Sequence, residues 1–257
     1  MRGTILVEGG RIRCTDTGGG NPPVVLLHGD WTDSGVWAPV IPLIRDDFRV
    51  IAYDELGYGG SPPPTEVYTR LGNLRSLLDR LEPGRVTLVA HSGGANAALG
   101  LAITEPDRVA ALVLVAPGAY DYPWPEDDPF WAALGQRSMA GVGLRTHAAA
   151  QAVPPRRATE TGVVRAARAQ FRRAASAWEK TSVLREDGPA LYERLDQVAA
   201  PTVVMVGERE YPMVDTASRD FAARIGGATL TVVPGADHLL PLHSPAAVAT
   251  AIRDVTG

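Results

Sequence analysis

The stretch that decides the fold runs from Val86 to Gly100 and reads VTLVAHSGGANAALG. It opens on apolar and β-branched residues, which is typical of a buried strand, and its alanine-rich second half favours a helix. Ser92 lies between the two, beside a histidine and two glycines. A serine in this place is either a nucleophile on a strand-to-helix turn or an ordinary polar residue of a tight loop.

The same alternation of strand and helix continues on both sides of this stretch. Leucines recur at helical spacing over residues 71–81. Apolar runs with little polar alternation, typical of strands buried on both faces of a parallel sheet, occupy residues 24–29, 50–53, 109–116, 202–207 and 229–233. With two earlier strands around residues 9–23, they predict an α/β protein built on a mainly parallel, doubly wound sheet.

The alternation of predicted strands and helices stops between Pro117 and Ala200, where prolines, three tryptophans and a long run of helical character occur. We therefore predict a first core part at residues 1–117, a helical lid at 118–200 and a second core part at 201–257. Ligand sites in open α/β sheets lie beyond the carboxyl ends of the strands, so an insertion leaving such an end is well placed to cover one.

Composition limits the partners. The chain has 257 residues, 45% of them hydrophobic, and a formal net charge of -4, so we expect neither a nucleic-acid nor a membrane partner. Cys14 is the single cysteine, which excludes an intramolecular disulfide and a multi-cysteine metal site. The apolar stretch before Glu8 is too short for a signal peptide, and we predict a cytoplasmic protein.

A serine nucleophile needs a base, usually a histidine held by a carboxylate, and backbone donors for the oxyanion. Ser92 directly follows a predicted strand and precedes a predicted helix, which would expose its hydroxyl above the sheet. Gly94 supplies the small residue two positions later, whereas Ala90 stands where the G-x-S-x-G pattern has its first glycine.

Four further motifs accompany AHSGG along the chain: LLHGDW, DELGYGGS, VGERE and GADH. Their order and spacing over nearly the whole chain resemble the α/β-hydrolase family. The resemblance implies the order nucleophile, acid, histidine, with the acid after a late strand and the histidine in the last loop. His238 matches that histidine, and His243 is the weaker rival.

The same resemblance places Glu210 where relatives commonly have an aspartate, with the role of orienting the imidazole and stabilising the imidazolium. Asp121, after the strand where some relatives carry their acid, and Asp215 are the alternatives. The backbone N–H groups of Gly93 and Asp30 match the oxyanion donors. A carboxylate beside an oxyanion opposes its charge, so the Asp30 side chain must point away, be neutralised or touch the substrate. We hypothesise that it binds a polar substrate group or a water.

Other motif residues receive a structural interpretation: His28, Asp54, Gly57, Gly59 and Ser61. Aromatic residues offer apolar surface for a substrate, and we predict as pocket residues Trp31, Trp124, Trp131, Trp178 and Tyr211.

The predicted function is that of a serine hydrolase without cofactor or metal, acting on a small, fairly apolar ester, lactone or thioester. The same triad also serves acyl transfer, perhydrolysis, C–C bond cleavage and lyase chemistry, and the fold also serves small-molecule binding without turnover. The sequence does not predict an oligomeric state.

Overall fold

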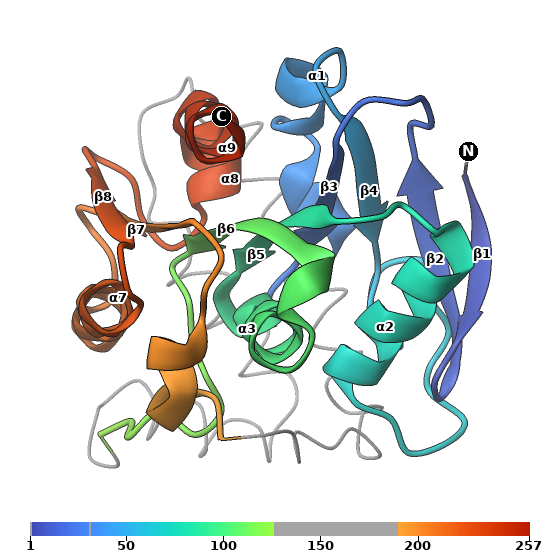
Figure 1. Ribbon diagram of the computed structural model, residues 1–257, viewed down its shortest axis with the longest axis horizontal. Helices are drawn as coiled ribbons and strands as arrows, with labels where there is room; N and C mark the ends of the chain where they lie inside the picture. The colour runs from blue at the N-terminus through green and yellow to red at the C-terminus, as the bar shows by residue number, and fades with distance from the viewer. Residues whose placement is uncertain (1, 31, 126–189) are drawn as a thin grey trace, which may run out of the picture.

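The computed structural model describes residues 2–30, 32–125 and 190–257, and in this part of the chain eight strands form one sheet (Figure 1). Their order across the sheet is β1-β2-β4-β3-β5-β6-β7-β8. The strands are β1 (Arg2–Val7), β2 (Gly10–Asp16), β3 (Pro23–Leu27), β4 (Arg49–Tyr53), β5 (Val86–His91), β6 (Val109–Val115), β7 (Thr202–Gly207) and β8 (Thr229–Val233). The predicted α/β fold with a mainly parallel sheet is confirmed.

Only β1 and β2 run antiparallel to their neighbours; β3 to β8 pair in parallel. Parallel pairing brings the carboxyl ends of β5, β7 and β8 to one edge of the sheet, where a site is expected. Residues 126–189 fall between β6 and β7 in the chain. The predicted lid lies mostly outside the described residues, so the three-part division of the chain stays a prediction.

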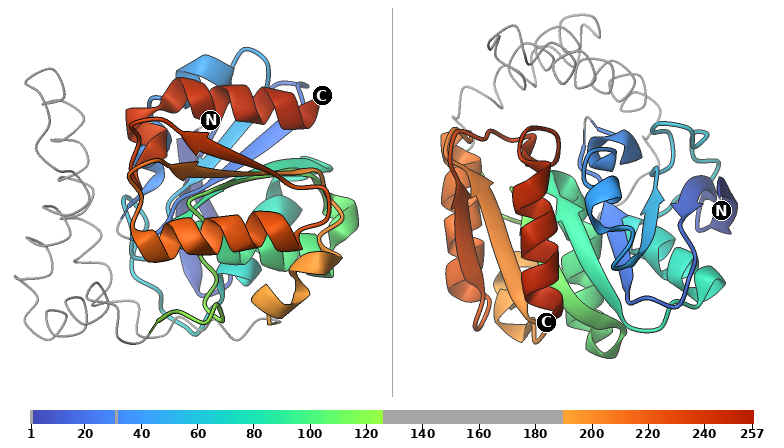
Figure 2. Two further views of the ribbon diagram at one scale, coloured as in Figure 1. Left: turned by 90° about the vertical axis from the view of Figure 1, so that its left-hand side faces the viewer. Right: turned by 90° about the horizontal axis from the view of Figure 1, so that it is seen from above.

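Helices cover both faces of the sheet (Figures 1 and 2). One face carries α2 (Arg70–Leu81), α3 (Ala95–Thr104) and α7 (Pro212–Arg224), and the other carries α1 (Ile41–Ile44), α8 (Leu240–His243) and α9 (Pro245–Thr256). Because successive side chains of a strand point to opposite faces, Val25 and Leu27 pack with the first group of helices and Val24 with the second.

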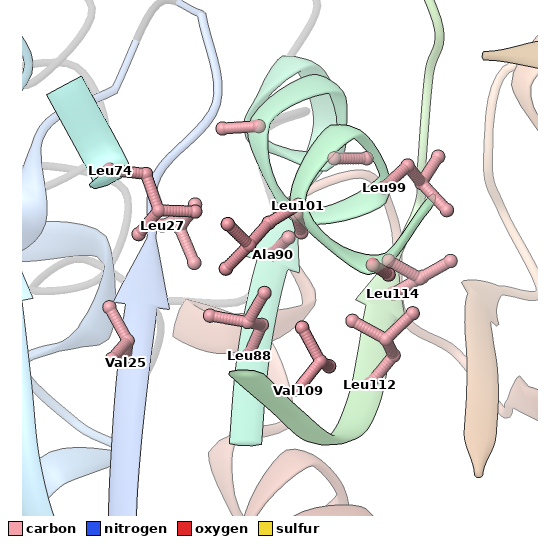
Figure 3. Close-up of a cluster of buried hydrophobic side chains, with 14 of the residues drawn as sticks. Val25, Leu27, Leu74, Leu88, Ala90, Leu99, Leu101, Val109, Leu112 and Leu114 are labelled. Atoms are coloured by element: carbon pink, nitrogen blue, oxygen red, sulfur yellow. The ribbon is translucent and has the colours of Figure 1, made fainter. Parts of the chain in front are cut away.

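The two helices that flank β5 along the chain form for different reasons. Helix α2 is amphipathic, and its cap residue Thr69 accepts a hydrogen bond from the Gly72 N–H at 2.8 Å. Helix α3 is apolar all round and is buried between the sheet and its neighbours, as the side chains around Leu99 and Leu101 show (Figure 3). No helix in the described ranges is long and apolar enough to cross a membrane.

We expect Leu88→Ala to lower the free energy of unfolding by about 3 kcal/mol, because it leaves a cavity in the middle of the sheet. Leu88 is fully buried and lies between its register partners Val25 and Leu112. Urea denaturation measures the change. The matched control is Leu6→Ala, at a side chain that is 64% exposed, with an expected change within about 0.5 kcal/mol. Equal values for both variants would contradict this packing.

Candidate active site

Ser92 occupies a strained turn between a buried strand and a buried helix. Strand β5 ends at His91, Ser92 has a φ of 50°, and a single 3-10 turn over Ser92–Gly94 leads into α3. A left-handed φ on a serine is uncommon and costs on the order of 1 to 3 kcal/mol, so its surroundings must hold it. The turn aims the hydroxyl away from the sheet, near the positive end of α3.

The glycine and the alanine of the motif both fit this turn. A Cβ at position 94 would lie 2.7 Å from the carbonyl oxygen of His28, so only glycine lets the helix start this close to the neighbouring loop. Ala90 pairs with Leu27 on β3 and Leu114 on β6, and its methyl group lies in the core (Figure 3). The departure from the usual first glycine is therefore accommodated by packing.

Three side chains predicted from the sequence form one chain of hydrogen bonds. His238 Nε2 lies 3.1 Å from Ser92 Oγ, and His238 Nδ1 lies 3.0 Å from Glu210 Oε1. A carboxylate only accepts, so Nδ1 carries the proton and Nε2 is left to accept from the serine hydroxyl. This is the tautomer in which an imidazole can remove a proton from Ser92.

Backbone hydrogen bonds between two loops bring Glu210 to His238. The Arg209 N–H donates to the Ala236 carbonyl at 2.9 Å, and the Glu208 N–H donates to the Val233 carbonyl at 3.0 Å. The Glu210 side chain is completely buried, and its Oε1 also accepts from the Tyr211 N–H at 2.9 Å. The carboxylate is thus fixed by its own loop as well as by the imidazole.

The surroundings of His238 favour its protonated form. Burial lowers the pKa of the imidazole, but the charge and hydrogen bond of Glu210, with smaller effects from Asp237 and Asp30, outweigh this and raise the pKa above its ordinary value of 6.5. An imidazole with a raised pKa is a stronger base, which suits the removal of a proton from a hydroxyl.

The alternative acids and the alternative histidine are engaged elsewhere. Asp121 Oδ2 accepts from the Tyr192 N–H at 3.0 Å, and Asp215 forms an ion pair with Arg219 at 2.9 Å. His243 Nδ1 lies 2.7 Å from Asp237 Oδ1. Within the described residues, Glu210 is the carboxylate that hydrogen-bonds to His238.

The loop after β3 packs directly on the serine. A Cβ at Gly29 would lie 2.7 Å from the Ser92 Cβ, which places the backbone of Gly29 beside Ser92, and the Asp30 carboxylate lies against Gly93. His28 steadies this loop: its Nδ1 donates to the Gly29 carbonyl at 2.8 Å, and its Nε2 accepts from the Glu55 N–H at 3.0 Å. This arrangement agrees with a structural interpretation of His28.

The remaining motif residues make a turn. Asp54 accepts from the backbone N–H groups of Ser34 and Gly60, both at 2.8 Å, and its own carbonyl accepts from the Ser61 hydroxyl at 2.6 Å. Gly57 and Gly59 have positive φ values within the same loop. These contacts hold the loop that carries Glu55, the partner of His28.

Arg70 contacts the candidate site, and sequence reasoning missed it. Its guanidinium pairs with the Asp30 carboxylate although the two residues are 40 positions apart. Of the three options stated for Asp30, neutralisation is the one that the structure shows. No pattern in the sequence indicates this contact, because Arg70 begins a helix whose arginines are otherwise surface residues.

His91 is the second residue that sequence reasoning missed. It is completely buried, its ring lies 4.9 Å from that of His238, and its Nε2 donates to the His238 carbonyl at 2.8 Å. Burial and the neighbouring His238 lower the pKa of His91 to about 3, so it stays neutral. A neutral donor fixed to the backbone of residue 238 positions the loop that carries the candidate base.

Two of the five predicted pocket residues lie in the described part of the chain. The Tyr211 and His238 rings are 6.0 Å apart, and Trp124 packs with Tyr211 against Ala116, Met213 and Val214. Trp31, Trp131 and Trp178 lie outside the described residues. The described ranges also contain no cluster of three or more His, Cys, Asp or Glu side chains able to hold a metal.

The chain belongs to the alpha/beta hydrolase family, whose model matches residues 24–251. Over 243 residues, it is 26% identical to a putative carbamate hydrolase RutD from Caulobacter, an alignment that covers 89% of this chain and 88% of that protein. A shorter alignment gives 37% identity to the 2-hydroxy-6-oxononadienedioate/2-hydroxy-6-oxononatrienedioate hydrolase of Cupriavidus pinatubonensis, but it covers only 42% of this chain and 40% of that relative.

The fold also matches a thermophilic esterase from Thermogutta terrifontis with a TM-score of 0.77 and 26% identity, covering 99% of this chain and 97% of the other. These relatives are named as hydrolases, and hydrolase chemistry in general is what they support for this chain. They do not identify its substrate.

We expect the two histidines to differ sharply in titration. In a histidine NMR titration, His91 keeps its neutral, Nε2-protonated ring between about pH 5 and 9, whereas His238 takes up a proton at a pH above about 6.5. A His91→Gln variant, which retains an amide donor, assigns the signals. Protonation of His91 within that pH range would show that its burial and its bond to residue 238 are wrong.

Proposed function

We propose that the protein is a serine hydrolase that cleaves a small, fairly apolar ester, lactone or thioester through an acyl-enzyme on Ser92. The observation that carries this proposal is the hydrogen-bond chain from Ser92 through His238 to the buried Glu210, with the serine on a strained turn. A loop serine without catalytic purpose needs neither this base nor this backbone conformation.

In the first half of the reaction, Ser92 Oγ attacks the substrate carbonyl carbon while His238 Nε2 takes its proton. Glu210 holds Nδ1–H and stabilises the imidazolium that forms. The carbonyl oxygen becomes an oxyanion, and the backbone N–H groups of Gly93 and Asp30 bind it. The imidazolium then gives its proton to the leaving alcohol or thiol, and the bond to that group breaks, leaving the acyl group on Ser92.

In the second half, water attacks the acyl-enzyme as His238 accepts its proton. A second oxyanion forms at the same place and collapses, and the proton passes to Ser92 Oγ as the acid leaves. A lactone follows the same steps, except that the alcohol and the acid remain parts of one product. Every proton transfer uses Nε2, the nitrogen that faces the serine.

The apolar character of the substrate rests on the aromatic surface beside the site. Tyr211 lies next to His238, and Trp124 packs on the same small cluster. Trp31, Trp131 and Trp178 remain predicted pocket residues. Acyl transfer, perhydrolysis, C–C cleavage, lyase chemistry and binding without turnover would use the same residues, and the following tests separate hydrolysis from binding.

We expect Ser92→Ala to lower kcat for p-nitrophenyl acetate by at least about 10⁴-fold, because the nucleophile is lost. A fluorophosphonate probe labels the wild-type protein at Ser92 and does not label the variant. A protein that binds small molecules without turnover would show neither hydrolysis nor labelling. Full activity in Ser92→Ala would refute the acyl-enzyme.

Two substitutions of Glu210 separate its charge from its length. Glu210→Gln removes the charge that raises the pKa of His238, so the acidic limb of the kcat/KM profile moves to lower pH, and kcat falls by about 10³- to 10⁴-fold. Glu210→Asp keeps the charge but shortens the reach, so the limb stays in place and kcat falls by about 10- to 100-fold.

The direction of this pH shift follows from the protonation state that His238 needs as a base. The base must be neutral to accept a proton, so activity is lost as pH falls through the pKa of His238, and a lower pKa extends activity to lower pH. Wild-type kcat together with an unmoved limb in Glu210→Gln would exclude Glu210 as the acid.

A further inference from the structure

An ion pair lies directly over the residue that follows the candidate nucleophile. Arg70 Nη2 donates to Asp30 Oδ1, and the two side chains differ in exposure: 4% for Arg70 and 27% for Asp30. The guanidinium is therefore buried behind the carboxylate, and the carboxylate is the member that reaches the open side. An almost fully buried arginine side chain is unusual and requires a partner.

The position of the pair follows from the glycine beneath it. A Cβ at Gly93 would collide with the Asp30 carboxylate and would lie 2.9 Å from Arg70 Nη1. The ion pair thus fills the space that a side chain at position 93 would take. It also holds the carboxylate over the residue whose backbone N–H binds the oxyanion in the proposed function.

This arrangement poses an electrostatic problem. A lone carboxylate over Gly93 would oppose the negative charge that develops on the substrate oxygen. Arg70 offsets the repulsion between the carboxylate and the oxyanion, because its positive charge lies against the Asp30 carboxylate. The two charges come from separate elements, because Asp30 follows β3 and Arg70 is the first residue of α2.

The first turn of α2, which begins at Arg70, is held by a buried polar contact. Asn73, one turn further along α2, donates to Glu55 Oε2 at 2.8 Å, and Glu55 follows strand β4 in the loop that also contacts His28. The start of α2 is thereby tied to the same loop that supports the backbone around Gly29. The helix turn that carries Arg70 is therefore held by the fold, and Asp30 is the partner of its guanidinium.

We propose that Arg70 is a positioning residue for the oxyanion hole: it neutralises the Asp30 carboxylate and holds it aside, so that the Asp30 and Gly93 backbone donors act on the oxyanion unopposed. The inference rests on the proposed function and deepens it. Its consequence is that the site works with both charges or with neither, but not with Asp30 charged alone.

A double-mutant set tests this charge logic: D30N, R70M and D30N/R70M, with p-nitrophenyl acetate as a neutral substrate at about pH 8. We expect R70M to lower kcat by about 100-fold, the size typical of losing one oxyanion interaction, with KM within about threefold of wild type. In D30N/R70M the negative charge of Asp30 is gone, and kcat recovers at least about tenfold relative to R70M.

R70K is the conservative control. It keeps the positive charge but not the planar fork, so we expect its kcat to lie between those of wild type and R70M. Thermal unfolding monitors the fold of each variant. Should R70M fail to fold, R70Q takes its place, because an amide retains a donor to Asp30 without the charge.

The pH profile gives a second readout. The charged groups that bear on His238 are Glu210, Asp237 and Asp30, and the neutral His91 ring lies beside it. Asp30 is among the groups that raise the pKa of His238, so D30N moves the acidic limb of kcat/KM to lower pH. R70M, which leaves the Asp30 charge without its counter-ion, moves the limb to higher pH.

These experiments separate the proposed role of the Arg70–Asp30 pair from the proposed hydrolase function. A purely structural ion pair predicts that the double variant is no more active than R70M, and that result overturns the proposal, as does R70M with kcat within about threefold of wild type. In both cases the wild-type protein still hydrolyses the ester and is labelled by a fluorophosphonate at Ser92. If the wild type does neither, the proposed function itself is wrong.

Discussion

The left-handed backbone of Ser92 is the constraint on which the rest of the site depends. A serine adopts a φ of 50° only where its neighbours leave no alternative. Strand β5 is fixed on both sides by β3 and β6, α3 is buried along most of its length, and Gly94 lies against the carbonyl of His28. The core therefore holds the turn, and the turn directs the hydroxyl to the edge of the sheet.

Parallel pairing of the strands then brings Glu210 and His238 to the same edge as Ser92. Strands β5, β7 and β8 end at one edge, so the loops after them meet there, and backbone hydrogen bonds from residues 208 and 209 to residues 233 and 236 lock two of them together. His91 adds a third tie, from β5 to the carbonyl of His238. The loop of His238, the proposed base, is thus tied to two other strand ends, which limits the motion of its imidazole relative to Ser92.

Sequence reasoning predicted the parts that repeat along the chain or follow a motif. Periodic leucines indicated α2, uninterrupted apolar runs indicated a parallel sheet, and ordered motifs indicated where Ser92 and His238 lie. The VGERE motif indicated Glu210 as the acid, but Asp121 and Asp215 stayed open as alternatives, because the contact with His238 depends on hydrogen bonds between loops. Arg70 and His91 were missed because their roles arise from burial and from contacts between distant segments.

The proposed reaction needs negative charge on one side of the site, at the imidazolium, and its absence on the other, at the oxyanion. In the proposed reaction, the imidazolium that forms during proton transfer is stabilised by negative charge, which Glu210 supplies at Nδ1. The oxyanion that the same proposal places beside Gly93 would be destabilised by negative charge. The Glu210 carboxylate contacts His238 Nδ1, whereas the Asp30 carboxylate over Gly93 is joined to the buried guanidinium of Arg70. In the proposed reaction, the pairing of Asp30 alone with a guanidinium lets one small site stabilise both the imidazolium of His238 and the oxyanion.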